Sequence, residues 1–131
     1  MVTGLVVTSC ITHATPATFS AHVVHRDLES EIAVHQIGDY PLGRQVDLMF
    51  GGGRCFFLPN SSADSCRTDD RNVSDDAINK FGFNFLSSRK EFDNLKLSRK
   101  EYVSLSHKYT HSVFIIIIII ITIIIGLLMT I

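Results

Sequence analysis

The chain has 131 residues, of which 46% are hydrophobic, and a formal net charge of −1. This length leaves room for one domain at most, on a prior of roughly 100–200 residues per domain. A net charge so close to zero gives no electrostatic reason to expect nucleic acid as a partner. Three cysteines are too few for a disulfide scaffold, and their odd number leaves at least one outside any internal pair.

The first half of the chain predicts two strands with two helices between them. An apolar, β-rich run over 5–8 predicts a strand that is buried on both faces. A helix is expected over about 15–26, because its first residue is a threonine that can cap it and proline follows. A second helix, capped by Asp27, is expected over 28–38, and a second buried strand over 46–50. This order predicts an α/β fold in which the two strands pair in parallel.

The next part predicts shorter elements. Residues 59–76 are rich in Ser, Asp and Asn and predict an exposed loop. Ser74 can cap a short helix over 75–81, which a glycine then ends. Residues 83–86 predict a third strand, and one more short helix is expected within 87–95.

The C-terminal part has a different character. Residues 98–112 are polar without clear periodicity and predict a linker. Residues 113–131 are uncharged, and their number approaches the roughly 20 that span a bilayer as a helix. Ten of the residues from 115 to 125 are isoleucine, which is unusual even for a membrane span. This segment is therefore a candidate transmembrane helix or a spurious tail.

The stretch THATPATFSAHVVHR places a histidine, a threonine and an arginine around the predicted first helix. Thr15 and Arg26 are separated by about three turns of ~3.6 residues, so they would share one helix face. A threonine hydroxyl suits Mg²⁺, a histidine can orient one of its waters, and an arginine fork matches two phosphate oxygens. The simpler alternative is that Thr15 caps the helix, His13 lies at the surface and Arg26 is a solvated cation at the helix end.

Residue spacing indicates two other candidate sites. Cys10-x-x-His13 and His22-x-x-His25 have the pair spacing of zinc ligands, although one pair would follow a strand and the other would lie on a helix. The glycines at 51–53 could cradle an anion, but the Lys-Ser/Thr of a phosphate loop is missing. A turn at the end of a strand is the favoured interpretation of the glycines.

Three stretches are specific enough to carry a resemblance: THATPATFSAHVVHRD, EIAVHQIGDYPLGRQVDLMFGGGRCFFLPNSSADSCRTDDR and FGFNFLSSRKEFDNLKL. Over almost all of 2–97 the chain resembles the alkaline phosphatases, most closely their fungal vacuolar branch. The resemblance implies a fragment of a three-layer α/β/α sandwich. The hydrophobic composition of 113–131 adds a C-terminal, candidate transmembrane helix to it. It divides the chain into a partial phosphatase domain over 1–97, an unrelated linker over 98–112 and the hydrophobic segment over 113–131.

The resemblance implies a hydrolase of phosphate monoesters that forms a phosphoserine intermediate and uses two zinc ions and one magnesium ion. Thr15 matches the position whose hydroxyl binds magnesium. His13 matches a neighbour of that ion, which binds it through water or supports its ligands. Arg26 matches the arginine that binds the substrate phosphate. The family's nucleophilic serine and zinc ligands lie outside the matched region, so none is expected in this chain.

The chain also departs from the family pattern. Cys10 and Cys55 stand where the fungal relatives usually have arginine, which hints at a decaying copy. Cys66 matches a cysteine that the relatives also carry, and its disulfide partner is expected to be missing here. Beyond residue 97 the tail follows no family pattern, and it is either a real anchor or translated intron sequence.

These observations predict an alkaline phosphatase by family whose isolated chain has negligible activity and poor solubility, since the sheet would have bare edges. The expected substrates are phosphate monoesters, and the expected location is a membrane, the vacuole or another lumen. Family members are homodimers, but the fragment need not retain that interface. The alternative is a non-catalytic, membrane-anchored interaction protein or a degenerate gene product.

Overall fold

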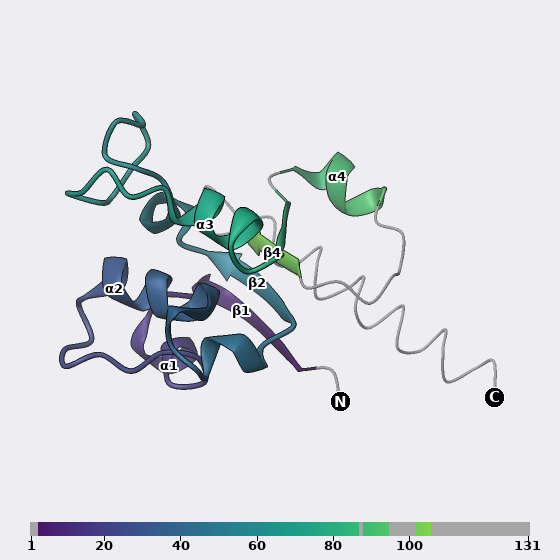
Figure 1. Cartoon of the computed structure of the whole chain (residues 1–131). Coiled ribbons are helices and arrows are strands. Elements are labelled where there is room, and N and C mark those ends of the chain that lie inside the picture. Colours follow the sequence, from purple (N-terminus) through teal and green to yellow (C-terminus); the bar gives the residue numbers. More distant parts are fainter. Residues whose placement is uncertain (1–2, 87, 95–101, 106–131) are drawn as a thin grey trace.

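The computed structural model describes residues 3–86, 88–94 and 102–105. Its centre is a four-stranded sheet in which every neighbouring pair of strands is parallel (Figure 1). The strands are β1 (Gly4–Cys10), β2 (Leu48–Gly52), β3 (Asn84–Leu86) and β4 (Tyr102–Leu105), and their order in the sheet is β1-β2-β4-β3. The predicted α/β class and the parallel pairing of the first two strands are confirmed.

Short helices connect the strands. They are α1 (Ala14–Ala17), α2 (Glu29–Val34), η1 (His35–Asp39), η2 (Gly43–Gln45), η3 (Arg54–Phe57), α3 (Val73–Asn79) and α4 (Arg89–Asp93). α2 continues directly into η1, and the backbone leaves the helical conformation at Gly38, where φ is 120°. The predicted end of the second helix is therefore confirmed, and glycine suits that positive φ.

The hydrophobic core lies between one face of the sheet and a layer formed by α2, η1, η3 and α3 (Figure 1). Its fully or nearly buried members are Ile11, Ala33, Ile37, Val46, Met49, Phe57, Val73, Ala77 and Phe83. Leu5 and Val7 of β1 pack against this cluster, whereas Val6 and Thr8, on the other face, are exposed. The prediction that the first strand is buried on both faces is wrong, because alternate side chains of a strand point to opposite faces and the core covers one.

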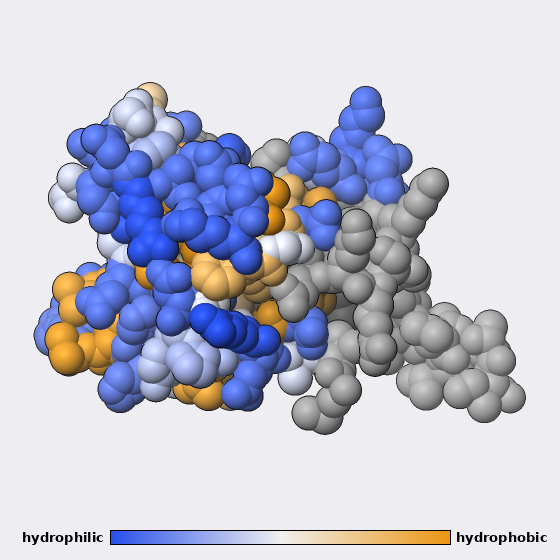
Figure 2. Space-filling view, viewed as in Figure 1, coloured by the Kyte–Doolittle hydropathy of each residue, from blue (hydrophilic) through white to orange (hydrophobic). Residues whose placement is uncertain are grey.

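The first helix is much shorter than predicted. α1 ends at Ala17, and helix-like hydrogen bonding continues only to the 2.8 Å bond from the Ala21 amide to the Ala17 carbonyl. Residues 18–24 are mainly threonine, serine, valine and aromatic or histidine side chains, which are weak helix formers. Phe19 and Val24 are exposed, and Figure 2 shows apolar surface over this loop between α1 and α2. Little apolar burial is therefore available to extend the helix.

The third strand and the short helices near it form close to where they were predicted, whereas the predicted cap at Asp27 is wrong, because α2 begins after Leu28 without a side-chain cap. β3 and α4 form where a strand and a short helix were expected. α4 begins with a reciprocal pair of hydrogen bonds between Ser88 and Glu91, which is a capping box. α3 begins earlier than predicted, because the Asn72 side chain, and not Ser74, accepts a hydrogen bond from the Asp75 amide at 3.2 Å.

The strand β4 was missed, because it lies within the 98–112 segment that was expected to be a linker. It pairs with β2 on one side and β3 on the other, so it belongs to the sheet. Its sequence, Tyr-Val-Ser-Leu, does combine an aromatic and a β-branched residue, which favour strands. The hydrophobic segment 113–131 lies outside the described residues, and no helix within them is long and apolar enough to cross a membrane.

The polar stretch after β2 is closed by a disulfide between Cys55 and Cys66, whose Cα atoms are 4.9 Å apart. The expectation that the partner of Cys66 is missing is therefore wrong. η3 carries Cys55 back towards the loop, and the Cys66 amide donates to the Cys55 carbonyl at 3.0 Å. Cys10, the third cysteine, is buried and takes no part in this disulfide.

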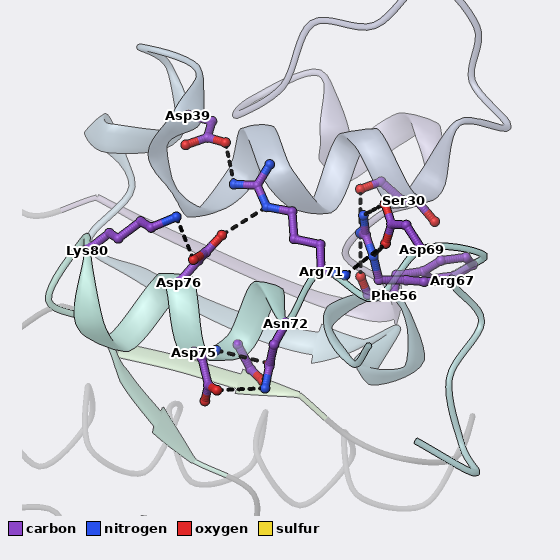
Figure 3. A network of polar contacts seen from close by, with 11 residues as sticks. Ser30, Asp39, Phe56, Arg67, Asp69, Arg71, Asn72, Asp75, Asp76 and Lys80 are labelled. Carbon is purple, nitrogen blue, oxygen red and sulfur yellow. Dashed lines mark hydrogen bonds and ion pairs between the residues drawn. The ribbon is translucent and has the colours of Figure 1, made fainter. Parts of the chain in front are cut away.

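Arg67 is buried within the stretch that was predicted to be an exposed loop, and its side chain is only 3% exposed. Its Nη1 donates to the carbonyl of Ser30 at 2.8 Å and to that of Phe56 at 3.0 Å (Figure 3). Its Nε and Nη2 bind the two carboxylate oxygens of Asp69 at 2.6 and 2.7 Å. Arg67 thus joins the loop to both α2 and η3.

Arg71 makes a second connection, from the same loop to η1 and α3. Its guanidinium binds Asp39 at 2.6 Å and Asp76 at 2.8 Å (Figure 3). Partial burial lowers the pKa of Arg71, but the hydrogen bonds to the two carboxylates outweigh it and raise that pKa. The pKa of Asp76 is lowered by its hydrogen bond with Lys80 and then by that with Arg71.

We expect Arg67→Met to destabilise the fold. The substitution leaves the Ser30 and Phe56 carbonyls without their donor, at about 1–3 kcal/mol for each buried group. Urea unfolding of the full chain in mild detergent measures the change in the free energy of unfolding. The matched control is Arg89→Met, which removes an exposed ion pair with Asp93 and should cost less than about 1 kcal/mol. Equal losses in the two variants would contradict the role given to Arg67.

The loop network also predicts acid sensitivity. A hydrogen bond from Arg67 lowers the pKa of Asp69 below its ordinary value of 3.8, and the pKa of Asp76 is lowered as well. A carboxyl group whose pKa is lower in the folded state than in the unfolded state stabilises the fold at pH values above its unfolded-state pKa. This stabilisation is lost as the pH falls through the pKa of the folded state. We therefore expect unfolding to become easier below about pH 4, and Asp76→Asn to weaken that dependence. The urea concentration at the midpoint of unfolding, measured from pH 7 to pH 3, tests this expectation, and substitution of the exposed Asp70 by Asn is the control. If the midpoint of Asp76→Asn fell with pH as steeply as that of the unsubstituted chain, the expectation would be contradicted.

Candidate functional site

The candidate site lies at the carboxyl ends of β1 and β2, which are neighbours in the sheet. Cys10, the last residue of β1, is in register with Gly52, the last residue of β2. The Ile11 amide extends the pairing by donating to the Gly52 carbonyl at 3.1 Å. Ligands of open parallel sheets bind outside the carboxyl ends of the strands, so this edge is where a site is expected.

The turn that follows β1 is held by backbone and buried polar contacts. The His13 amide donates to the Cys10 carbonyl at 3.1 Å, which closes the turn. Fully buried Gln36 of η1 donates from its Nε2 to the Ile11 carbonyl at 2.7 Å. The position of the side chains that follow β1 is therefore tied to the helix layer.

The glycines at the end of β2 allow this turn to approach closely. A Cβ atom on Gly51 would lie 2.4 Å from Cγ2 of Ile11 and 2.8 Å from Cγ2 of Val7. Gly53 has a φ of 93°, and its Cβ position lies 3.1 Å from both the Thr12 hydroxyl and Cβ of Cys10. Gly51 and Gly52 are thus the last residues of β2, and only Gly53 lies in the turn that the sequence favoured for all three. Together they leave room for the side chains of the facing turn.

His13 and Thr15 both lie at the start of α1, shortly after the end of β1. His13 is the residue before the helix and is half-buried, and Thr15 is the second residue of the helix and is exposed. Thr15 is therefore not the helix cap that the sequence predicted. Thr15 is exposed, so a ligand could reach it from solvent.

Arg26 lies in an exposed turn shortly before α2. The argument that placed Arg26 above Thr15 on one helix face is wrong, because α1 ends at Ala17. Any approach of Arg26 to Thr15 depends on the path of the loop between the two helices. The phosphate-binding role that the resemblance implies for Arg26 does not depend on that helix.

The described residues contain one group of three potential metal ligands from His, Cys, Asp or Glu, namely Cys10, His13 and Glu29. One ligand atom from each lies within 4.8 Å of the others. The Thr12 hydroxyl donates to Oε2 of Glu29 at 2.5 Å, which fixes the carboxylate. Sequence reasoning missed Glu29, because no short motif links it to Cys10 and His13, which lie much earlier in the chain.

The second pair of the zinc hypothesis lies elsewhere. The ring of His22 stacks on Tyr40, with 5.8 Å between the ring centroids. Nδ1 of His25 lies 3.5 Å from a carboxylate oxygen of Asp27, and His25 is exposed. The hypothesis is therefore right about Cys10 and His13 lying together and wrong about the two later histidines.

A magnesium ion fits the described residues only in part. Mg²⁺ takes oxygen ligands in near-octahedral geometry and usually keeps several waters. The Thr15 hydroxyl supplies one such oxygen, and the half-buried ring of His13 stands two residues away along the chain. The described residues provide no set of carboxylates and histidines matching a pair of zinc ions beside it, since the one cluster is that of Cys10, His13 and Glu29.

We expect Gly51→Ala to disturb the site. The new methyl group would collide with Ile11 and Val7, and overpacking of this kind costs about 1–3 kcal/mol. Gly4→Ala is the matched control in β1, because its Cβ would meet its nearest neighbour at an ordinary 3.6 Å. Urea unfolding of both variants measures the difference. A Gly51→Ala variant as stable as Gly4→Ala would contradict the close approach.

Comparison with known proteins gives a consistent result. A family model described as alkaline phosphatase matches residues 1–105. The alkaline phosphatase of Schizosaccharomyces pombe is 48% identical over 107 residues, which make up 82% of this chain and 20% of that protein. The repressible alkaline phosphatase of Saccharomyces cerevisiae is 49% identical over 109 residues, or 79% of this chain and 19% of that protein. The chain thus spans about one fifth of the length of these curated relatives.

Solved structures agree with the sequence matches. The alkaline phosphatase of the Antarctic bacterium TAB5 aligns with a TM-score of 0.63 and 30% identity, over 86% of this chain and 29% of that one. A histidine-to-glutamate variant of the same enzyme, with magnesium bound in its M3 site, aligns with a TM-score of 0.65 and 29% identity. The described α/β structure therefore corresponds to part of an alkaline phosphatase.

Proposed function

Because the chain belongs to the alkaline phosphatase family, we propose that it is part of a metal-dependent hydrolase of phosphate monoesters that acts through a phosphoserine intermediate. The family match over residues 1–105 is the observation that carries this proposal. The position of the candidate residues supports it, because His13 and Thr15 lie where a parallel sheet places its ligands. The described sheet and helix layer would form part of a three-layer sandwich in the complete enzyme.

Three residues of this chain would serve the reaction. Arg26 would bind two oxygens of the substrate phosphate through its planar fork and stabilise the charge that develops on them. Its exposure is suited to this role, since a phosphate could reach it from solvent. Thr15 would hold magnesium through its hydroxyl oxygen, and His13 would orient a water of that ion or support its ligands.

The zinc ions of such an enzyme would act, when bound, as Lewis acids on a phosphoryl oxygen. The residues described here do not match a pair of zinc sites, so no step through zinc is assigned to this chain. The sequence also lacks the Asp-Ser-Ala context of the family's nucleophile. We therefore propose that the isolated chain has negligible phosphatase activity and needs further parts of a complete enzyme.

The disulfide and the names of the relatives both indicate in which cellular compartment the protein is located. A disulfide between Cys55 and Cys66 suits an oxidising compartment, such as a lumen. We place the protein at a membrane or in a lumen such as the vacuole, with 113–131 as a candidate anchor. Relatives include an enzyme named as membrane-bound, from Bombyx mori. The complete enzyme would form a homodimer, which this chain need not do alone.

A chimera tests the role of Arg26. We would replace the matching segment of the S. pombe enzyme with residues 12–71 of this chain and assay a chromogenic phosphate monoester at alkaline pH. The chimera should be active, and Arg26→Ala should lower its kcat/KM by about 10²–10³-fold. His25→Ala is the control, because His25 is exposed and contacts Asp27.

Three outcomes would contradict the proposal. An Arg26→Ala chimera with unchanged kcat/KM would remove Arg26 from the phosphate site. Activity of the isolated full chain that is lost on Arg26→Ala would show that the chain already holds a working active site. Inactivity of the unsubstituted chimera, with the S. pombe parent active, would show that this segment cannot supply the family's function.

A further inference from the structure

The cluster of Cys10, His13 and Glu29 plays no part in the proposed hydrolysis except through His13. Cys10 is the last residue of β1, His13 precedes α1, and Glu29 is the first residue of α2. The turn after β1 and the start of α2, which are separate in the sequence, therefore bring a sulfur, a nitrogen and an oxygen to one place. We propose that these three side chains bind one zinc ion, with water as its fourth ligand.

The ligand types fit zinc. Zinc binds cysteine sulfur, histidine nitrogen and carboxylate oxygen, and sites with three protein ligands keep a water in the fourth position. Metal–ligand distances of about 2.0–2.3 Å in a tetrahedron place neighbouring ligand atoms roughly 3.3–3.8 Å apart. The ligand atoms here already lie within 4.8 Å of one another, so side-chain shifts of about 1 Å complete the geometry.

The surrounding contacts hold the ligands in position. The Thr12 hydroxyl donates to Oε2 of Glu29 and leaves the other carboxylate oxygen for the metal. Hydrogen bonds of this kind orient ligands, and their loss typically weakens metal binding by about 10–100-fold. The short hydrogen-bonded turn from Cys10 to His13 fixes the spacing of the sulfur and the ring. Gly53 leaves space beside Cys10 and Thr12 that a side chain would fill.

Burial supports a site of this kind. Cys10 is buried, and His13 and Glu29 are half-buried, so the cluster is partly shielded from solvent and not closed off from it. Binding replaces the thiol proton of Cys10, which leaves to solvent, with the metal. His13 can serve only one of the two ions at a time, so the zinc site is proposed for the isolated chain and the magnesium role for the complete enzyme. The zinc site itself does not rest on the proposed phosphatase function.

The test is titration of the full, disulfide-bonded chain with Co²⁺ as a spectroscopic substitute for zinc. The expected result is one Co²⁺ per chain, tetrahedral visible bands and a thiolate-to-cobalt charge-transfer band that zinc abolishes. Cys10→Ser should remove the charge-transfer band. Glu29→Gln should weaken zinc binding by at least about 100-fold, and Thr12→Val by about 10-fold.

His25→Ala is the matched control, since His25 is an exposed histidine of the same region and contacts Asp27. It should leave the zinc affinity unchanged. Absence of saturable stoichiometric binding would overturn the proposal, as would a charge-transfer band that survives Cys10→Ser. A loss of affinity in His25→Ala as large as in Glu29→Gln would overturn it as well.

X-ray absorption at the zinc edge of the unsubstituted chain keeps the proposal testable if a variant fails to fold. One sulfur at about 2.3 Å and the remaining ligands as nitrogen or oxygen at about 2.0–2.2 Å would support it. A shell without sulfur, or with two sulfurs, would overturn it. Both measurements are independent of phosphatase activity, so failure of the zinc site and failure of the proposed function remain distinguishable.

Discussion

The buried guanidinium of Arg67 is the interaction on which the arrangement of the described residues depends. It binds the carbonyls of Ser30 and Phe56 and both carboxylate oxygens of Asp69, so it connects α2, η3 and the loop after the disulfide. A buried charge is costly unless it is paired and hydrogen-bonded, and here the carboxylate and the two carbonyls meet that requirement. Because Ser30 follows Glu29 directly, the contact that holds the loop also positions the start of α2.

A second constraint acts at the end of the sheet. Gly51 leaves room for Ile11 to pack against β2, and Gln36 holds the Ile11 carbonyl from the helix layer. Both contacts act on the turn that carries Thr12 and His13. The turn that carries the candidate site is therefore held by two contacts, one with the sheet and one with η1. Rigid support of this kind is what a site built from a short turn requires, since a turn alone would not fix its side chains.

Much of the fold could be predicted from local sequence. Apolar runs predicted β1 and β2, the second of them followed by glycines, and Gly38 correctly marked the end of the second helix. The predicted helix does not reach Arg26, because proline at position 16 favours only a first turn and most residues of 18–24 have weak helix propensity. β4 was missed for the opposite reason, since a polar neighbourhood masks a strand that the sheet stabilises on both sides.

The site was predictable only as far as its residues are close in sequence. Cys10 and His13 were paired by their spacing, whereas Glu29 joins them through the tertiary fold, as Cys55 joins Cys66 and Arg67 joins Ser30. An arginine at position 10, as the resemblance leads one to expect, would bring a cation to the carboxylate of Glu29. A cysteine brings a soft sulfur ligand beside a ring nitrogen and a carboxylate oxygen instead. A single side chain therefore decides whether this corner can form an ion pair or bind a metal.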